Sequence, residues 1–184
     1  MSIIMPENLH KLKISGTNIR KEILKEHSKL QAMKIAAWAE KWQQRIKALV
    51  NLMVNDEYRV VQRVARVISH IAERRPVLIT PYLPLLVSSM ENKNAPVAAK
   101  RNVVRVLQYV EIPPTLQGPV MKICFDFLSD PKETVAVKCF SMTVLAGLSK
   151  QFPDIRNELR LLIDEQWENA TAGFKARARK MQLR

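Results

Sequence analysis

Arginines recur at helical spacing in two stretches of this chain, and guanidinium groups placed in this way can bind anions. Arg59, Arg63 and Arg66 follow one another at intervals of four and three residues, and Arg101 and Arg105 are four residues apart. Side chains at these intervals lie on one face of a helix. Such a face could neutralise phosphates or dock an acidic peptide. The competing interpretation is a solvated surface whose arginines form ion pairs within the protein.

Catalysis has much weaker support in the sequence. An enzyme needs a nucleophile, a base and an orienting group, or a metal constellation. His10, His27 and His70 are far apart, and the acidic stretch from Asp154 to Glu168 lacks the spacing of a metal site. We therefore expect a protein that is not an enzyme and has no metal, no cofactor and no evident small-molecule substrate.

The composition indicates helices as the elements that carry these arginines. The chain has 184 residues, 47% of them hydrophobic, but only 4 glycines, which favours helices with short connections over a sheet. Its net charge is +13. No acidic residue follows Glu168, so the tail is basic, as is common where cations complement the dipole of a last helix.

A pattern recurs four times along the chain. Gln62, Lys100, Lys138 and Arg177 stand at equivalent places, 38, 38 and 39 residues apart. Three columns before these anchors are apolar in every segment: Ala48, Leu86, Cys124 and Ile163; Leu52, Met90, Leu128 and Trp167; and Val61, Ala99, Val137 and Ala176. Each segment therefore predicts a pair of helices with a polar turn between them, in which Pro131 suits the first position of a helix.

These segments resemble HEAT repeats. The closest match is Asp130-Pro131-Lys132-Glu133-Thr134-Val135-Ala136-Val137-Lys138, which carries the family's acidic-Pro turn and its Val followed by a basic residue. The resemblance covers about residues 40 to 184 and implies an all-α fold, a right-handed α-solenoid of about four helical pairs. The other segments depart from the motif, because none of them combines an acidic turn residue with a following proline in this way.

The chain divides accordingly. Residues 1–17 are expected to be a flexible segment and 18–184 a single α-solenoid domain. Residues 18–40 do not follow the repeat and are interpreted as a helical cap, with Ile35, Trp38 and Trp42 buried and Lys29, Lys34, Glu40 and Lys41 pointing outward. The repeats are placed at about 41–75, 76–112, 113–152 and 153–184.

In HEAT repeats the second helices line the concave surface, so the resemblance implies a basic groove that binds a partner. The residues predicted to bind it are Arg59, Arg63, Arg66, Lys100, Arg101, Arg105, Lys138 and Arg177. We expect an acidic protein or peptide as partner and a role as an interaction or scaffold module.

Two alternatives remain open. Sequence-independent nucleic-acid binding would favour aromatic side chains beside the cations, and only Tyr58 and Tyr109 lie near the basic helices. A HEAT-like DNA alkylation-repair glycosylase is less favoured, because it would need a carboxylate on that face, and no acid lies between Arg59 and Glu73 or between Val97 and Val110.

Location and redox state follow from absences in the sequence. Pro6, Glu7 and His10 interrupt the region where a signal peptide would be apolar, and charges interrupt each later hydrophobic run. A cytoplasmic protein without membrane contact is expected. Cys124 and Cys139 have apolar neighbours and are interpreted as reduced core residues.

Overall fold

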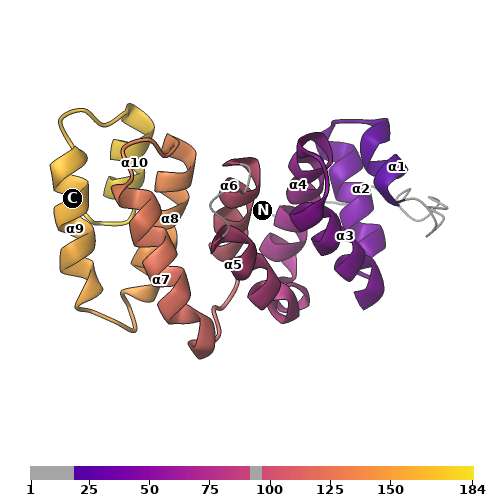
Figure 1. Ribbon diagram of the computed structural model, residues 1–184, viewed down its shortest axis with the longest axis horizontal. Helices are drawn as coiled ribbons and strands as arrows, with labels where there is room; N and C mark the ends of the chain where they lie inside the picture. The colour runs from indigo at the N-terminus through magenta and orange to yellow at the C-terminus, as the bar shows by residue number, and fades with distance from the viewer. Residues whose placement is uncertain (1–18, 92–96) are drawn as a thin grey trace, which may run out of the picture.

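The computed structural model describes residues 19–91 and 97–184, and within them the chain forms ten α-helices, two short 3-10 helices and no β-strand (Figure 1). The α-helices are α1 (Ile19–Lys25), α2 (Lys29–Ala39), α3 (Gln43–Asn55), α4 (Tyr58–Arg74), α5 (Leu83–Glu91), α6 (Val97–Leu107), α7 (Pro114–Ser129), α8 (Val135–Leu148), α9 (Ile155–Gln166) and α10 (Ala172–Lys180). The 3-10 helices η3 (Pro76–Leu78) and η4 (Thr80–Tyr82) connect α4 to α5. The predicted all-α fold is confirmed, while the segment 1–17 lies outside the described residues.

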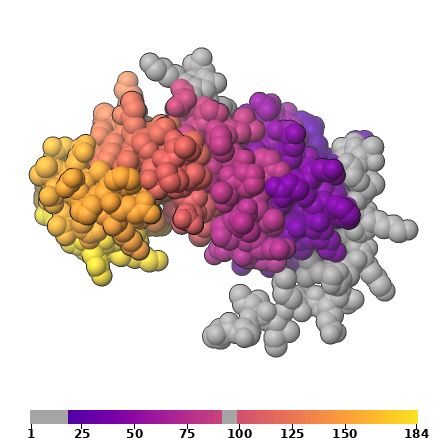
Figure 2. Space-filling view, turned by 90° about the horizontal axis from the view of Figure 1, so that it is seen from below, coloured from indigo at the N-terminus to yellow at the C-terminus, as the bar shows by residue number. Residues whose placement is uncertain are grey.

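Consecutive helices pack in pairs, and the pairs stack in two layers. The second-helix layer consists of α2, α4, α6, α8 and α10, each in contact with the next, and the first-helix layer consists of α3, α5, α7 and α9. The pairs follow one another along the long axis, from α1 at one end to α9 and α10 at the other (Figures 1 and 2). Neighbouring helices contact one another more extensively within the second-helix layer, as expected on the inner side of a curved stack. The architecture is that of a HEAT-like solenoid.

Helix α4 shows how the sequence produces this packing. Val60, Val64 and Ile71 recur at helical spacing and are each 0% exposed, so α4 is held between its neighbours by a continuous apolar stripe. Pro76 lacks the amide hydrogen that would continue the helix, and α4 ends at Arg74 just before it. Proline thus sets the boundary between this helical pair and the next.

The third segment has the register that the repeat predicts, with Cys124, Leu128 and Val137 each 0% exposed. In the first segment the buried stripe lies one residue later. Leu49 and Met53 are 0% and 1% exposed there, whereas the predicted Ala48 and Leu52 are only partly buried.

In the fourth segment the first helix keeps the predicted register, with Ile163 0% exposed and Trp167 packed against the core, but the second helix does not. Ala176 is exposed, whereas Phe174 and Ala178 are buried. Thr134 and Thr171 are the N-caps of α8 and α10, so Lys175 occupies the position that Lys138 has in the third segment, four residues after the cap. Arg177 is therefore not equivalent to Lys138, because the spacing was matched by charge and not by the start of the helix.

The turn between α7 and α8 also differs from the prediction. Pro131 is not at the first position of a helix, because α8 begins at Val135. The Asp130 side chain accepts a hydrogen bond from the backbone amide of Lys132 at 2.8 Å. Asp130 and Pro131 therefore shape the turn and leave the capping position to Thr134.

The N-terminal region is a pair of helices. Ser28 interrupts the helical stretch and caps α2, its Oγ accepting a hydrogen bond from the Gln31 amide at 3.0 Å. Ile35 is buried as expected. Trp42 is not, since it lies between α2 and α3 with 60% of its surface exposed. Trp38 is partly buried, and the Arg45 guanidinium lies 4.1 Å from its ring centroid.

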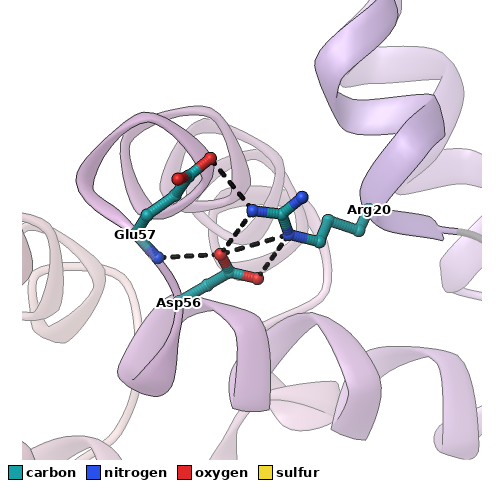
Figure 3. A network of polar contacts seen from close by, with 3 residues as sticks. All are labelled: Arg20, Asp56 and Glu57. Atoms are coloured by element: carbon teal, nitrogen blue, oxygen red, sulfur yellow. Dashed lines mark hydrogen bonds and ion pairs between the residues drawn. The ribbon is translucent and has the colours of Figure 1, made fainter.

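Helix α1 is held to the turn between α3 and α4 by a polar network (Figure 3). The Arg20 guanidinium donates from Nε to Asp56 Oδ2 at 3.0 Å and forms an ion pair with Glu57 at 2.9 Å. Asp56 also accepts a hydrogen bond from the Glu57 amide. The hydrogen bond from Arg20 lowers the pKa of Asp56, so this contact favours the charged carboxylate.

Both cysteines are free and buried, which confirms their interpretation as reduced core residues. Burial raises the pKa of the Cys124 thiol to about 12. Burial also raises the pKa of Cys139, whose Sγ lies 3.9 Å from the carbonyl oxygen of Gly173. Neither thiol has the character of a reactive cysteine, which requires a lowered pKa and access to solvent.

Glu40 was expected to point outward, but its side chain is only 7% exposed. It follows α2 and pairs with Arg74 across 3.3 Å, while its second oxygen is buried without a hydrogen-bond partner. Loss of hydration raises its pKa above the ordinary value, and the charges of Arg74 and Arg75 oppose that rise. Its ionisation is therefore less favourable in the folded state than in water.

Glu40→Gln is expected to raise the free energy of unfolding at pH 7 by about 1 kcal/mol, because a neutral amide costs less to bury than a carboxylate. A raised folded pKa means that the wild type loses stability as the pH rises through the unfolded value. The gain should therefore vanish below pH 4.5, where the carboxyl is protonated in both states. Urea unfolding at pH 7 and below pH 4.5 measures the difference in stability between variant and wild type, with Glu111→Gln, at an exposed position, as the control. A variant less stable at pH 7 would show that the Arg74 ion pair outweighs the desolvation.

Candidate functional site

Arg63, one of the predicted binding residues, is engaged in holding the fold together. Its Nη1 donates to the carbonyl oxygens of Leu24 at 2.8 Å and Ile23 at 3.2 Å. These carbonyl groups belong to the last turn of α1, where the helix itself supplies no hydrogen-bond donors for them. Arg63 therefore fixes α1 on α4, and its hydrogen-bonding capacity is partly used.

Lys100 and Lys138 point toward the first helix of the following pair. Lys100 Nζ lies 5.7 Å from the ring centroid of Phe127 in α7. Lys138 is only 8% exposed, and its Nζ donates to Gln166 Oε1 of α9 at 2.7 Å. The recurring basic position thus joins one pair to the next, and the ammonium group of Lys138 is already engaged within the fold.

Arg177 reaches back across the second-helix layer. Its Nη1 donates to Thr143 Oγ1 of α8 at 2.7 Å and to Gln108 Oε1, just beyond α6, at 3.1 Å. The guanidinium also lies 6.0 Å from the ring centroid of Phe140. Arg177 therefore connects three successive helical pairs, and its hydrogen-bonding capacity is partly used.

The remaining predicted residues are Arg59, Arg66, Arg101 and Arg105. Arg59 is exposed and the other three are partly exposed. Their side chains have no hydrogen-bond or ion-pair partner within 19–91 and 97–184. These four guanidiniums, on the neighbouring helices α4 and α6, are the ones that can bind a partner without breaking a contact of the fold.

Two further residues join them and were not predicted. His70 lies one turn after Arg66 on α4, and it is surrounded by the charges of Arg66 on α4, Arg105 on α6 and Lys29 on α2, with Glu73 of α4 as the one opposing charge. Burial, followed by the effect of Arg66, lowers the pKa of His70. We call Lys29, Arg66, His70 and Arg105 the His70 cluster. The four-residue spacing of Arg66 and His70 could have indicated part of it, but the approach of Lys29 depends on the packing of α2 against α4.

The charges of the second-helix layer are positive with one exception. Every one of α2, α4, α6, α8 and α10 carries lysine or arginine, and Glu73 is the single acidic residue within these five helices. Among the first helices, by contrast, α5, α7 and α9 carry acids, with Glu158, Asp164 and Glu165 on α9 alone. Most of the net positive charge of the helices is therefore on the layer that faces the inner side of the stack.

The paired helices, their stacking in two layers and the turn motif between α7 and α8 agree with the comparison to known families. A family model for the HEAT repeat domain matches residues 19–182. This chain belongs to the HEAT repeat family. The match includes α1 and α2, the region that the sequence alone did not align to the repeat. Comparisons with curated proteins and with solved structures gave no match.

HEAT repeats generally act in protein binding and are usually not catalytic. Within the described part of this HEAT repeat protein, no group of three or more His, Cys, Asp or Glu residues could hold a metal ion. No helix there is long and apolar enough to span a bilayer. The specific function has to be inferred from the surface.

A second feature of the surface is a cleft of about 420 Å³ where α7, α8, α9 and α10 meet. Lys138 lines it together with Glu133 and Glu165, and Leu162 and Phe174 supply apolar walls. Its charged groups have both signs, with two carboxylates against one ammonium group. Its electrostatics therefore differ from those of the second-helix layer.

Proposed function

We propose that this HEAT repeat protein is a non-enzymatic interaction module that docks an acidic segment of another protein on its second-helix layer. The observation that carries the proposal is the charge of that layer, where Glu73 is the only acid within five helices. A surface of one sign attracts a partner of the opposite sign and accelerates its association. The fold supplies a long array of parallel helices for such a partner to lie on.

Within this layer, Arg66, Arg101 and Arg105 are the residues proposed to contact the acidic segment, with Arg59 at the edge. Their guanidinium groups are at least partly exposed and have no partner among the described residues. Guanidinium groups bind carboxylates in a bidentate manner, which fixes orientation as well as charge. Arg63 and Lys138 have structural roles in this layer, since they donate hydrogen bonds to the Leu24 carbonyl and to Gln166.

Nucleic-acid binding is the second candidate, and the exposed tyrosines favour it. Tyr58 and Tyr109 are 58% and 37% exposed and could stack on bases. A phosphate backbone, however, needs a track of cations along several helices. Arg63, Lys138 and Arg177 would be part of that track, and they are held by other groups of the protein. We therefore favour a protein partner.

Fluorescence anisotropy distinguishes the two candidates. The probes are a labelled peptide of ten alternating Asp and Glu residues, duplex DNA, and single-stranded DNA and RNA, measured from about 50 to 200 mM salt. We expect the protein to bind the peptide more tightly than any nucleic acid, and the affinity to weaken as salt screens the charges. Tighter binding of a nucleic acid, with a steep salt dependence, would contradict the proposal. So would a failure to bind the peptide at the lowest salt concentration.

A further inference from the structure

The His70 cluster concentrates positive charge at one place on the second-helix layer. Arg66 and His70 are one helical turn apart on α4, Arg105 approaches from α6, and Lys29 approaches from the start of α2. The helices α2, α4 and α6 pack side by side in that order. Charges on three neighbouring helices therefore act on the same imidazole.

The protein balances this charge only in part. At His70 the charges of Lys29, Arg66 and Arg105 are opposed by that of Glu73, and Glu26 lines a small pocket beside Arg66. None of the three cations has an ion-pair partner within 19–91 and 97–184. Cations brought together in this way repel one another, so a bound anion would relieve an unfavourable arrangement.

His70 adds a polar atom that has no partner. Its Nε2 is buried and makes no hydrogen bond in the described structure, although the residue as a whole is partly exposed. Because this nitrogen is closed off from solvent, His70 would respond to a bound anion through charge and not through a direct hydrogen bond. An anion held among the cations would favour the protonated imidazole.

We propose that the His70 cluster binds a phosphoryl group on the docked segment, and that the partner is a phosphorylated protein segment. The inference rests on the proposed function, because it assigns the chemistry of the group bound on the same layer. A phosphoryl group carries close to two negative charges and three acceptor oxygens. It matches the excess charge of the cluster and the donors of Arg66 and Arg105, whereas a carboxylate supplies half the charge.

The confinement of the cluster favours a single phosphoryl group over a nucleic acid. Arg63 on the same helix is bound to the carbonyls of α1, and Arg177 at the other end of the layer is bound to Thr143 and Gln108. Cations with unused donors lie on α2, α4 and α6, and others lie at the end of α10. Between them, α8 carries only Lys138, which is buried and bound to Gln166, so the row of cations is interrupted. This is the arrangement of a point site, while a nucleic acid presents a row of phosphates.

The imidazole of His70 serves as a spectroscopic reporter of the site. The NMR resonance of His70 is identified as the one that is missing from the spectrum of His70→Gln. The pKa of His70 is then measured by NMR in the presence of sulfate or of acetate, at equal ionic strength. Sulfate is a tetrahedral dianion that does not titrate over about pH 5 to 8, the range in which His titrates. We expect sulfate to raise the pKa of His70 by about 1 unit or more, because a bound dianion stabilises imidazolium, and acetate to raise it much less.

Peptide binding provides the second measurement. A labelled peptide with one phosphoserine among Asp and Gly residues is compared with its Ser and Glu forms by anisotropy. We expect the phosphorylated form to bind at least about tenfold more tightly than the Glu form, and this preference to disappear in Arg105→Gln.

The outcomes separate the two levels of the proposal. Equal affinities for the phosphorylated and Glu peptides, with no response of His70 to sulfate, would overturn the phosphoryl site and leave acidic docking intact. Failure of every acidic peptide to bind would overturn both. If duplex DNA displaced the labelled phosphopeptide at a lower concentration than the unlabelled phosphopeptide does, the phosphoryl proposal would be overturned in favour of nucleic-acid binding.

Discussion

Leu128→Ala is expected to lower the free energy of unfolding by about 2 to 5 kcal/mol, the range for removing a fully buried leucine side chain. Leu128 is 0% exposed in the last turn of α7, where α7 packs against both α8 and α9. Truncation would leave a cavity among helices that are fixed by many other contacts, so the site cannot collapse to fill it. Urea unfolding followed by circular dichroism measures the change.

Leu161→Ala is the matched control for this prediction. Leu161 lies on the neighbouring α9 and is 65% exposed, so the same chemical change should cost no more than about 0.5 kcal/mol. If Leu128→Ala also cost less than about 0.5 kcal/mol, Leu128 would not be a core residue, and the register of the third repeat would be wrong.

Reversal of charge in Arg66→Glu/Arg105→Glu should weaken binding of the acidic peptide by at least about tenfold. Each exposed ion pair contributes up to about 1 kcal/mol, and reversal replaces attraction by repulsion of similar size. The helical content should stay the same, because neither side chain has a hydrogen-bond partner among the described residues. Arg63 is left unchanged, since its hydrogen bonds to Ile23 and Leu24 hold α1 in place.

The control for this experiment is Lys47→Glu/Arg160→Glu. It makes the same change in net charge, but both residues are exposed on α3 and α9, in the first-helix layer. We expect its affinity to fall by much less than that of the Arg66/Arg105 variant. An equal loss in the two variants would show that total charge, and not the second-helix face, governs binding.

Local properties of the sequence were enough to predict the helices and their repeat. The apolar stripe of α4, with Val60, Val64 and Ile71 at helical spacing, needs no knowledge of its neighbours. The same holds for the third repeat, where Leu128 and Val137 are buried as the pattern requires. The register failed for the first helix of the first segment and for the second helix of the fourth, because the segments were aligned on Gln62 and Arg177 instead of on the helix starts.

The N-terminal pair shows what a local pattern leaves undecided. Ser28 divides one helical stretch into α1 and α2, and Glu40, which is polar by type, is buried because Arg74 lies beside it. Trp42 is apolar by type and yet exposed, because it falls between two helices. Residue type alone predicts the average burial, and the chain path decides the individual case.

The sequence by itself determined that the second helices are basic and that they repeat, because charge and periodicity are properties of each segment. Only the tertiary structure decided which cations remain accessible. Arg63 is occupied by carbonyls some 40 residues away, and Lys138 by Gln166 of the next pair. Lys29, Arg66, His70 and Arg105 gather because α2, α4 and α6 pack in a row. Hydrogen bonds between distant segments depend on how the helices stack, and the residue spacing within one helix does not predict that stacking.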